Sequence, residues 1–145
     1  MTLTIERVET VLLRVPFDPV HAPHMERLAA DLSLVEVYRV YASGIVGYGE
    51  SLIQQVTRRA SPQRLAALRG RNVFDLLWDD SLGSGLQLAL WDAAGKAAGV
   101  PCHRLLGAQV RDRCSLAWWC RDMPAEDWAA EAQRAVASGY RALKL

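Results

Sequence analysis

The sequence predicts an α+β fold in which a three-stranded antiparallel meander is followed by helices and then by one parallel βαβ unit. Three patterns lead to this prediction. β-prone runs broken by turn residues fill residues 3–50, a long apolar helix occupies residues 84–98, and a strand, a helix and another strand share residues 113–145. Hydrophobic residues make up 51% of the chain and charged residues 23%, which is typical of a globular protein.

The meander is predicted from β-branched and aromatic residues between turn signals. These residues fill three runs: Leu3–Val15, Leu32–Tyr41 and Ile45–Glu50. Ser43-Gly44 forms the turn between the last two, which makes them a hairpin. Three prolines with polar neighbours predict a loop over Pro16–Asp31, and loops of this length are often lids or binding loops.

Capping residues define the helices that follow. Ser61-Pro62 opens a helix over residues 63–68. A longer helix runs over Ser84–Ala98 and ends at Gly99, and it has almost no polar face, so we expect it to be buried on most sides. Its charged residues Asp92 and Lys96 are spaced i,i+4, which predicts a structural ion pair.

The last part of the chain changes pattern. A strand over Arg113–Cys120, a helix over residues 122–138 and a strand over Tyr140–Leu145 form a βαβ unit, which predicts parallel strands. The expected packing stripe of the helix is Trp128, Ala132, Ala135 and Val136. Because two parallel strands leave their edges uncovered, we expect further chain or another chain to complete the sheet.

Charge and cysteine content exclude several classes of protein. The net charge of +1 lacks the cationic surplus that nucleic acid or an anionic membrane requires. Three cysteines are an odd number without metal-type spacing, which favours a reducing compartment. The N-terminus does not resemble a signal peptide, and no apolar run approaches the ~18 residues of a membrane span. The sequence therefore predicts a cytoplasmic protein.

Three segments together resemble the enolase superfamily, in its mandelate racemase and muconate lactonizing enzyme branch. GIVGYGE (Gly44–Glu50) is similar to the family's G-x-x-G-x-G-E hairpin. SGLQLALWDAAGKAAGVPCHRLLGA (Ser84–Ala108) is similar to its A-L-W-D-x-x-G-K-x-x-G-x-P helix signature. GYRALKL (Gly139–Leu145) is similar to the lead-in to its K-x-K catalytic strand. The resemblance spans the whole chain.

The resemblance implies a capping domain over residues 1–107 and the start of a barrel over residues 108–145, truncated after one βαβ unit. It implies a racemase, cycloisomerase or dehydratase that abstracts the proton next to the carboxylate of a small molecule. A carbon acid is too weak for an unaided base, so a divalent metal, usually Mg²⁺, takes up the developing charge. The family's metal ligands lie on later barrel strands, so we expect none here and an inactive isolated chain. The family also implies a homo-oligomer.

Lys144 is the catalytic residue that the resemblance implies. It matches the first lysine of K-x-K, which assists with the substrate carboxylate, whereas the second, the usual proton-transfer residue, would fall just past Leu145. Strand alternation independently places Lys144 with Ala142 on one face, at the end of the strand where barrel active sites lie. The alternative is a solvated lysine, which we prefer for the isolated chain.

Four residues are predicted to contact the substrate. His21 and His24 lie on the first loop, which in the family covers the barrel mouth. Trp119 is predicted to point into the barrel, and Arg121 follows the same strand, where it can meet a carboxylate. Each has an alternative role as an ordinary loop or strand-end residue. The second loop holds weaker candidates: Gln54, Gln55 and Thr57.

A second hypothesis belongs to another class of protein. In this alternative the chain is a non-catalytic interaction module that associates through its capping-domain face and the open sheet edges at Arg113–Cys120 and Tyr140–Leu145. Self-association that covers these edges distinguishes this hypothesis from the enzyme.

Overall fold

The structure is a computed structural model that describes residues 2–53 and 60–144. The chain forms two compact units, the first from Met1–Val15 and Asp31–Gln109 and the second from Pro16–Ala30 and Val110–Leu145. In chain order the elements are β1 (Ile5–Arg14), α1 (Ala22–Ala29), η1 (Ala30–Ser33), β2 (Leu34–Ala42), β3 (Ile45–Leu52), α2 (Pro62–Ala66), η2 (Val73–Asp75), η3 (Asp80–Leu82), α3 (Ser84–Ala98), α4 (Cys102–Leu106), β4 (Trp118–Trp119), α5 (Ala125–Ala137) and β5 (Leu143–Lys144).

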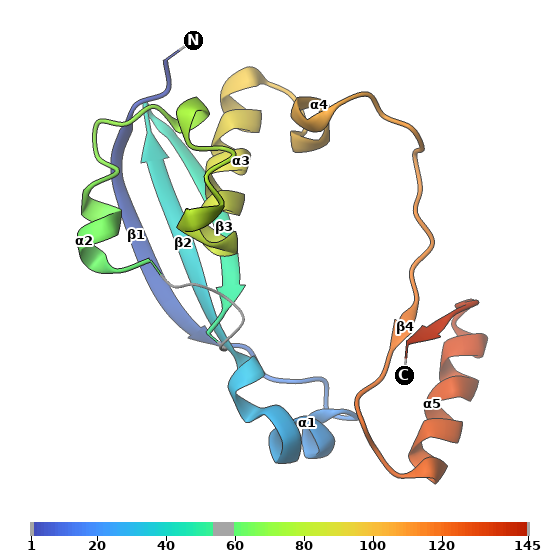
Figure 1. Ribbon diagram of the computed structural model, residues 1–145. Helices are drawn as coiled ribbons and strands as arrows, with labels where there is room; N and C mark the ends of the chain where they lie inside the picture. Colours follow the sequence, from blue (N-terminus) through green and yellow to red (C-terminus); the bar gives the residue numbers. More distant parts are fainter. Residues whose placement is uncertain (1, 54–59, 145) are drawn as a thin grey trace. The chain divides into compact units, whose positions relative to one another are not determined.

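The first unit contains the predicted antiparallel meander, with its strands in the order β1-β2-β3 (Figure 1). Ala42 pairs with Ile45, so the hairpin loop is the two residues Ser43 and Gly44. Both have positive φ, 47° and 79°, as the tight turn that matches strand twist requires. The three-stranded sheet, the helices after it and the parallel pair in the second unit confirm the predicted α+β class.

Helix α3 packs on the sheet with its backbone touching that of β3. A Cβ added to Gly47 would lie 2.1 Å from the carbonyl oxygen of Ala89. One added to Gly49 would lie 2.1 Å from the carbonyl oxygen of Gly85. Because only glycine leaves this space, the alternation G-x-G in β3 and the small residues of α3 are two halves of one contact.

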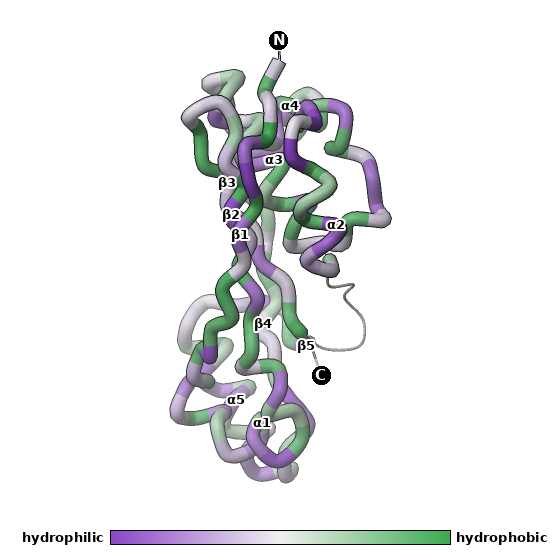
Figure 2. The backbone as a smooth tube through the Cα atoms, turned by 90° about the vertical axis from the view of Figure 1, so that its left-hand side faces the viewer, coloured by the Kyte–Doolittle hydropathy of each residue, from purple (hydrophilic) through white to green (hydrophobic). Residues whose placement is uncertain are grey.

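The core of the first unit lies between this helix and the sheet. β-strand alternation directs Tyr38 and Val40 of β2 toward α3. Leu86 and Leu90 of α3 belong to the same core cluster, and all four side chains are buried. Figure 2 shows both hydrophobic and hydrophilic stretches along the strands. Burial, together with the 2.6 Å hydrogen bond that the Tyr38 hydroxyl donates to Glu36, raises the pKa of Tyr38 to about 12.

Two charged residues of α3 cover the outer edge of β3. The backbone N–H of Tyr48 donates to Asp92 at 2.8 Å, and Lys96 donates to the carbonyl oxygen of Val46 at 2.9 Å. Asp92 and Lys96 also form the predicted i,i+4 ion pair, at 2.6 Å. Edge strands expose such backbone groups to pairing with other chains. The pair therefore closes one stretch of the sheet edge, a structural role that matches the prediction.

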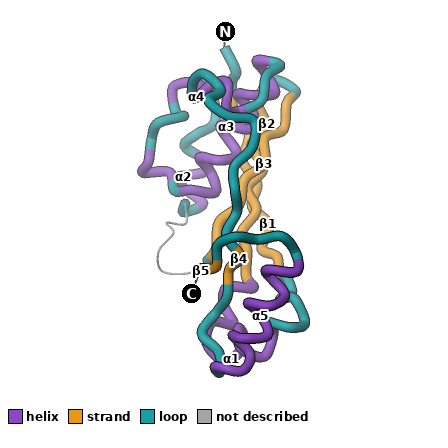
Figure 3. Tube along the Cα trace, turned by 90° about the vertical axis from the view of Figure 1, so that its right-hand side faces the viewer, coloured by secondary structure: helices purple, strands orange, loops and turns teal. Residues whose placement is uncertain are grey.

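The second unit holds two helices, α1 and α5, beside the short parallel strands β4 and β5 (Figure 3). Here the sequence analysis was partly wrong. Residues 22–29 form a helix where a loop was predicted, because Pro23 falls in the first helical turn, where no N–H is needed, and Met25 and Ala29 supply a buried face. The strand predicted over Arg113–Cys120 is reduced to β4.

Helix α5 lies where predicted but buries a different stripe. Ala135 is buried as expected, whereas Val136 is 73% exposed. Glu131 is buried in its place, one turn before Ala135. Only apolar residues were expected in the stripe, and Glu131 is buried there because hydrogen-bond donors surround its carboxylate.

Replacing Gly49 with alanine tests the backbone contact between β3 and α3. Gly49→Ala is expected to lower the free energy of unfolding by about 2 kcal/mol or more, because the new Cβ overlaps backbone atoms that cannot rotate away. The control Gly44→Ala meets no atom within 4 Å and should cost only about 1 kcal/mol for its positive φ. Urea denaturation followed by circular dichroism measures both, and an equal loss would contradict the contact.

Candidate functional site

Two predicted site residues lie next to each other in the second unit. The parallel register pairs Trp118 with Leu143 and Trp119 with Lys144. The N–H of Cys120 donates to the carbonyl oxygen of Lys144 at 3.2 Å, which holds the ends of the two strands together. Because paired residues of adjacent strands share a face, the side chains of Trp119 and Lys144 lie on the same face of the two strands. Both are exposed.

The opposite face of these strands is covered by α5. The indole N–H of Trp118 donates to Glu131 of α5 at 2.9 Å, and the Trp118 ring meets the ring of Tyr140 edge-on at 5.0 Å. Trp119 and Lys144 therefore point away from the helix. In a (β/α) barrel the helices cover the outside, so the face that carries Trp119 and Lys144 is the one that would line the interior.

Arg121 and Cys120 follow β4 at its carboxyl end. The Nε atom of Arg121 is buried and has no hydrogen-bond partner among the described residues. Burial, together with the negative charge of Glu131, raises the pKa of the Cys120 thiol, so this cysteine stays protonated and inert at neutral pH. The unused donor of this guanidinium and the exposed ammonium group of Lys144 are two features at this end of the strands that can bind an anion.

The two candidate histidines contact α5. His21 Nε2 lies 3.0 Å from Glu131 Oε2, and His24 Nε2 lies 3.4 Å from Asp127 Oδ2. An ionised carboxylate only accepts hydrogen bonds, so His21 carries its proton on Nε2. The candidates thus divide between two faces of β4, since His21 joins Trp118 on the helix side while Trp119 and Lys144 lie on the other. Roles of His21 and His24 toward a substrate stay predictions.

Glu131 is a polar centre that the sequence analysis missed. Its side chain is only 3% exposed and accepts hydrogen bonds from His21 and Trp118 on Oε2, while Arg134 lies 2.7 Å from Oε1. Burial pushes the pKa of Glu131 upward, but the hydrogen bonds from Trp118 and His21 outweigh it and leave the pKa below its ordinary value. The spacing of Glu131 from Trp128 and Ala135, i+3 and i−4, was the signal that could have found it.

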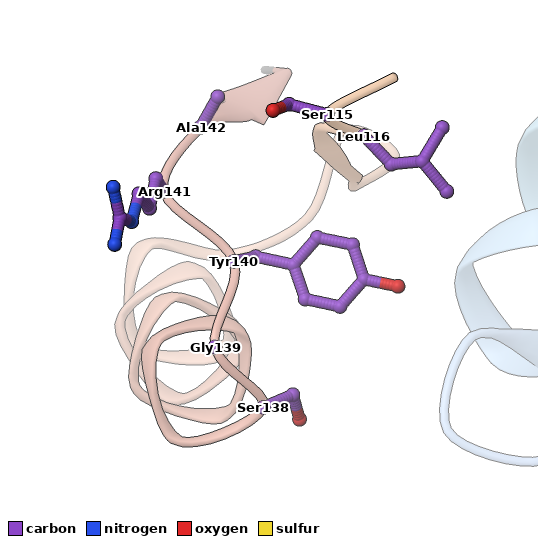
Figure 4. A pocket seen from close by; sticks show the side chains of 7 residues that line it. All are labelled: Ser115, Leu116, Ser138, Gly139, Tyr140, Arg141 and Ala142. Carbon is purple, nitrogen blue, oxygen red and sulfur yellow. The ribbon is translucent and has the colours of Figure 1, made fainter. Parts of the chain in front are cut away.

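A pocket of about 480 Å³ lies at the other end of the same strands. It is lined by residues that precede β4 and β5, with the ring of Tyr140 on one side and Arg141 pointing away from it (Figure 4). Active sites of barrels lie at the carboxyl ends of the strands, whereas the amino ends serve stability. We therefore assign no chemistry to this pocket.

A metal site is not found in the part of the chain that the structure describes. No three His, Cys, Asp or Glu side chains come together there in a way that could hold a metal ion. No described helix has both the length and the apolar character needed to cross a membrane. The weaker candidates Gln54, Gln55 and Thr57 lie outside the described residues.

No family model matches the chain, but curated proteins match part of it. A D-galactonate dehydratase of Variovorax paradoxus is 44% identical over 63 residues, which are 43% of this chain and 16% of that protein. The chain thus matches only about a sixth of the length of such curated relatives.

Solved structures cover the chain more completely. A mandelate racemase/muconate lactonizing enzyme-like protein from Rubrobacter xylanophilus superposes with a TM-score of 0.67 and 25% identity, over 100% of this chain and 42% of that one. A muconate cycloisomerase variant superposes with a TM-score of 0.65 and 28% identity, over 92% and 41%. In fold and in sequence the chain is therefore similar to the N-terminal part of enzymes in the mandelate racemase and muconate lactonizing enzyme branch of the enolase superfamily.

Proposed function

We propose that this chain is the N-terminal portion of a metal-dependent enzyme that abstracts the proton next to the carboxylate of a small molecule, as a racemase, cycloisomerase or dehydratase. One observation carries the proposal. Lys144 shares with Trp119 the face of β4 and β5 that α5 leaves uncovered, at the carboxyl end of the strands. A positive charge on that face would attract an anionic substrate to the ends of the strands.

The residues of this chain would bind and orient the substrate. Lys144 would donate hydrogen bonds to a substrate carboxylate oxygen, and its positive charge would favour the build-up of negative charge there. Arg121, with its unpartnered Nε, would offer a second donor at the same end of β4. Trp119 would supply an apolar wall beside Lys144. The segment Pro16–Ala30 would border the substrate, with the rings of His21 and His24 turned toward α5.

Mg²⁺ is the cofactor that we propose for the complete enzyme. When bound it would stabilise the enediolate. The described residues do not fit such a site, since they contain no cluster of three metal-binding side chains. We therefore derive no step through the metal from this chain and propose that the chain alone has no turnover. We further propose a cytoplasmic homo-oligomer without nucleic-acid or membrane partners.

Proton exchange in D₂O tests the catalytic proposal. With Mg²⁺ and a library of carboxylic acids that includes D-galactonate, a protein in which a complete barrel continues this chain should exchange the proton next to the carboxylate of at least one substrate. Lys144→Met should lower that exchange by about 100-fold or more, since it removes a charged group from the transition state. Lys96→Met, at the other lysine of the chain, should leave exchange nearly unchanged. Absence of exchange with every acid would count against the proposal.

The interaction module is the second candidate, and exposed apolar residues favour it. Leu116, just before the edge strand β4, is 69% exposed, and β4 pairs with β5 alone among the described residues. If the chain is such a module, it should sediment as a dimer or larger species that Leu116→Lys dissociates. The control Val136→Lys, on the exposed face of α5, should leave it associated. A monomer at all concentrations in analytical ultracentrifugation would rule the module out.

A further inference from the structure

The segment Pro16–Ala30 belongs to the second unit although it connects two strands of the first. Its helix α1 has eight residues and buries only two of them, Met25 and Ala29, so its apolar face is small. Two polar contacts join the segment to α5: His21 to Glu131 at 3.0 Å and His24 to Asp127 at 3.4 Å. These two contacts differ greatly in burial, because Glu131 is 3% exposed and Asp127 is 48% exposed.

The contact with Glu131 also reaches β4. A single carboxylate oxygen, Oε2, accepts from the ring of His21 and from the indole of Trp118, so the segment and the strand share one acceptor. Arg134 occupies the other oxygen. A buried carboxylate is costly unless donors surround it, and here each of its three donors comes from a different place: the segment, the strand and the helix itself.

We infer that Glu131 is a positioning residue, which fastens the segment Pro16–Ala30 to α5 and β4 through its shared hydrogen bonds to His21 and Trp118. Trp118 is the neighbour of Trp119 in β4, so the same bonds fix the strand that carries one of the candidate residues. The fastening itself is independent of any reaction. That the fastened segment borders a substrate rests on the proposed function.

Hydrogen exchange of the full chain at neutral pH tests the fastening. Glu131→Ala should raise the exchange rates of the amides in α1 by about tenfold or more, because local opening no longer breaks these bonds. Asp127→Asn, which alters only the longer and more exposed contact to His24, should change them much less. Unchanged exchange in α1 with the β1–β3 amides still protected would overturn the inference. If Glu131→Ala does not fold, His21→Ala removes the same bond from the segment side and should give the same acceleration.

The indole resonance of Trp118 gives a readout that general loss of packing would not mimic. Glu131 has a lowered pKa, so its ionised state stabilises the folded chain above the ordinary carboxylate pKa, and this stabilisation is lost as pH falls through the lowered value. The Trp118 indole N–H resonance, assigned by its absence in Trp118→Phe and its persistence in Trp119→Phe, should shift over that acidic range. The charged and titratable groups around Glu131 are His21, Arg134 and Cys120, with Asp18 lying 3.6 Å from the other ring nitrogen of His21.

Glu131→Gln should abolish the shift of the Trp118 resonance while Asp127→Asn retains it. A shift that persists in Glu131→Gln would assign the titration to another group and overturn the inference. In a complete enzyme, Glu131→Gln should raise KM more than it lowers kcat, since the segment would be displaced while the reacting groups stay in place. Because the exchange and resonance measurements need no substrate, their failure would be distinguishable from a failure of the proposed function.

Discussion

The direct contact between the backbones of β3 and α3 sets the position of nearly everything in the first unit. With no side chain at Gly47 or Gly49, the helix comes close enough for Leu86 and Leu90 to reach the buried side of β2. The same closeness brings Asp92 and Lys96 within hydrogen-bond distance of the strand's outer edge. A methyl group at either glycine would therefore disturb the core and the edge together, because both depend on the distance between α3 and the sheet.

Polar contacts contribute more to the second unit than to the first. Its two strands are two residues long each, and Glu131 of α5 is a buried carboxylate that contacts three side chains. Such networks rigidify a structure when every member has a partner, and a buried member that is left without one is costly. Glu131 thus orders a small unit that has few buried apolar groups, and it does so on the face of β4 opposite to Lys144.

Several of these features could be predicted from the sequence, and the reason in each case is local. The hairpin followed from Ser43-Gly44, and the ion pair from the spacing of Asp92 and Lys96, since neighbours along the chain decide both. Helix α1 was missed because prolines were interpreted as loop signals without regard to their place in the first turn. Glu131 was missed because its partners, His21 and Trp118, lie 110 and 13 residues away, and the packing that collects them is tertiary.

The edge contacts of Asp92 and Lys96 limit what the helix signature says about substrate. Both residues stand in the helix signature by which the chain resembles its family, yet each is occupied with the backbone of β3. A signature made of residues that hold a sheet together records shared ancestry and shared architecture, and it is silent about the compound that is turned over. Two proteins may agree at every one of these positions and still differ in substrate.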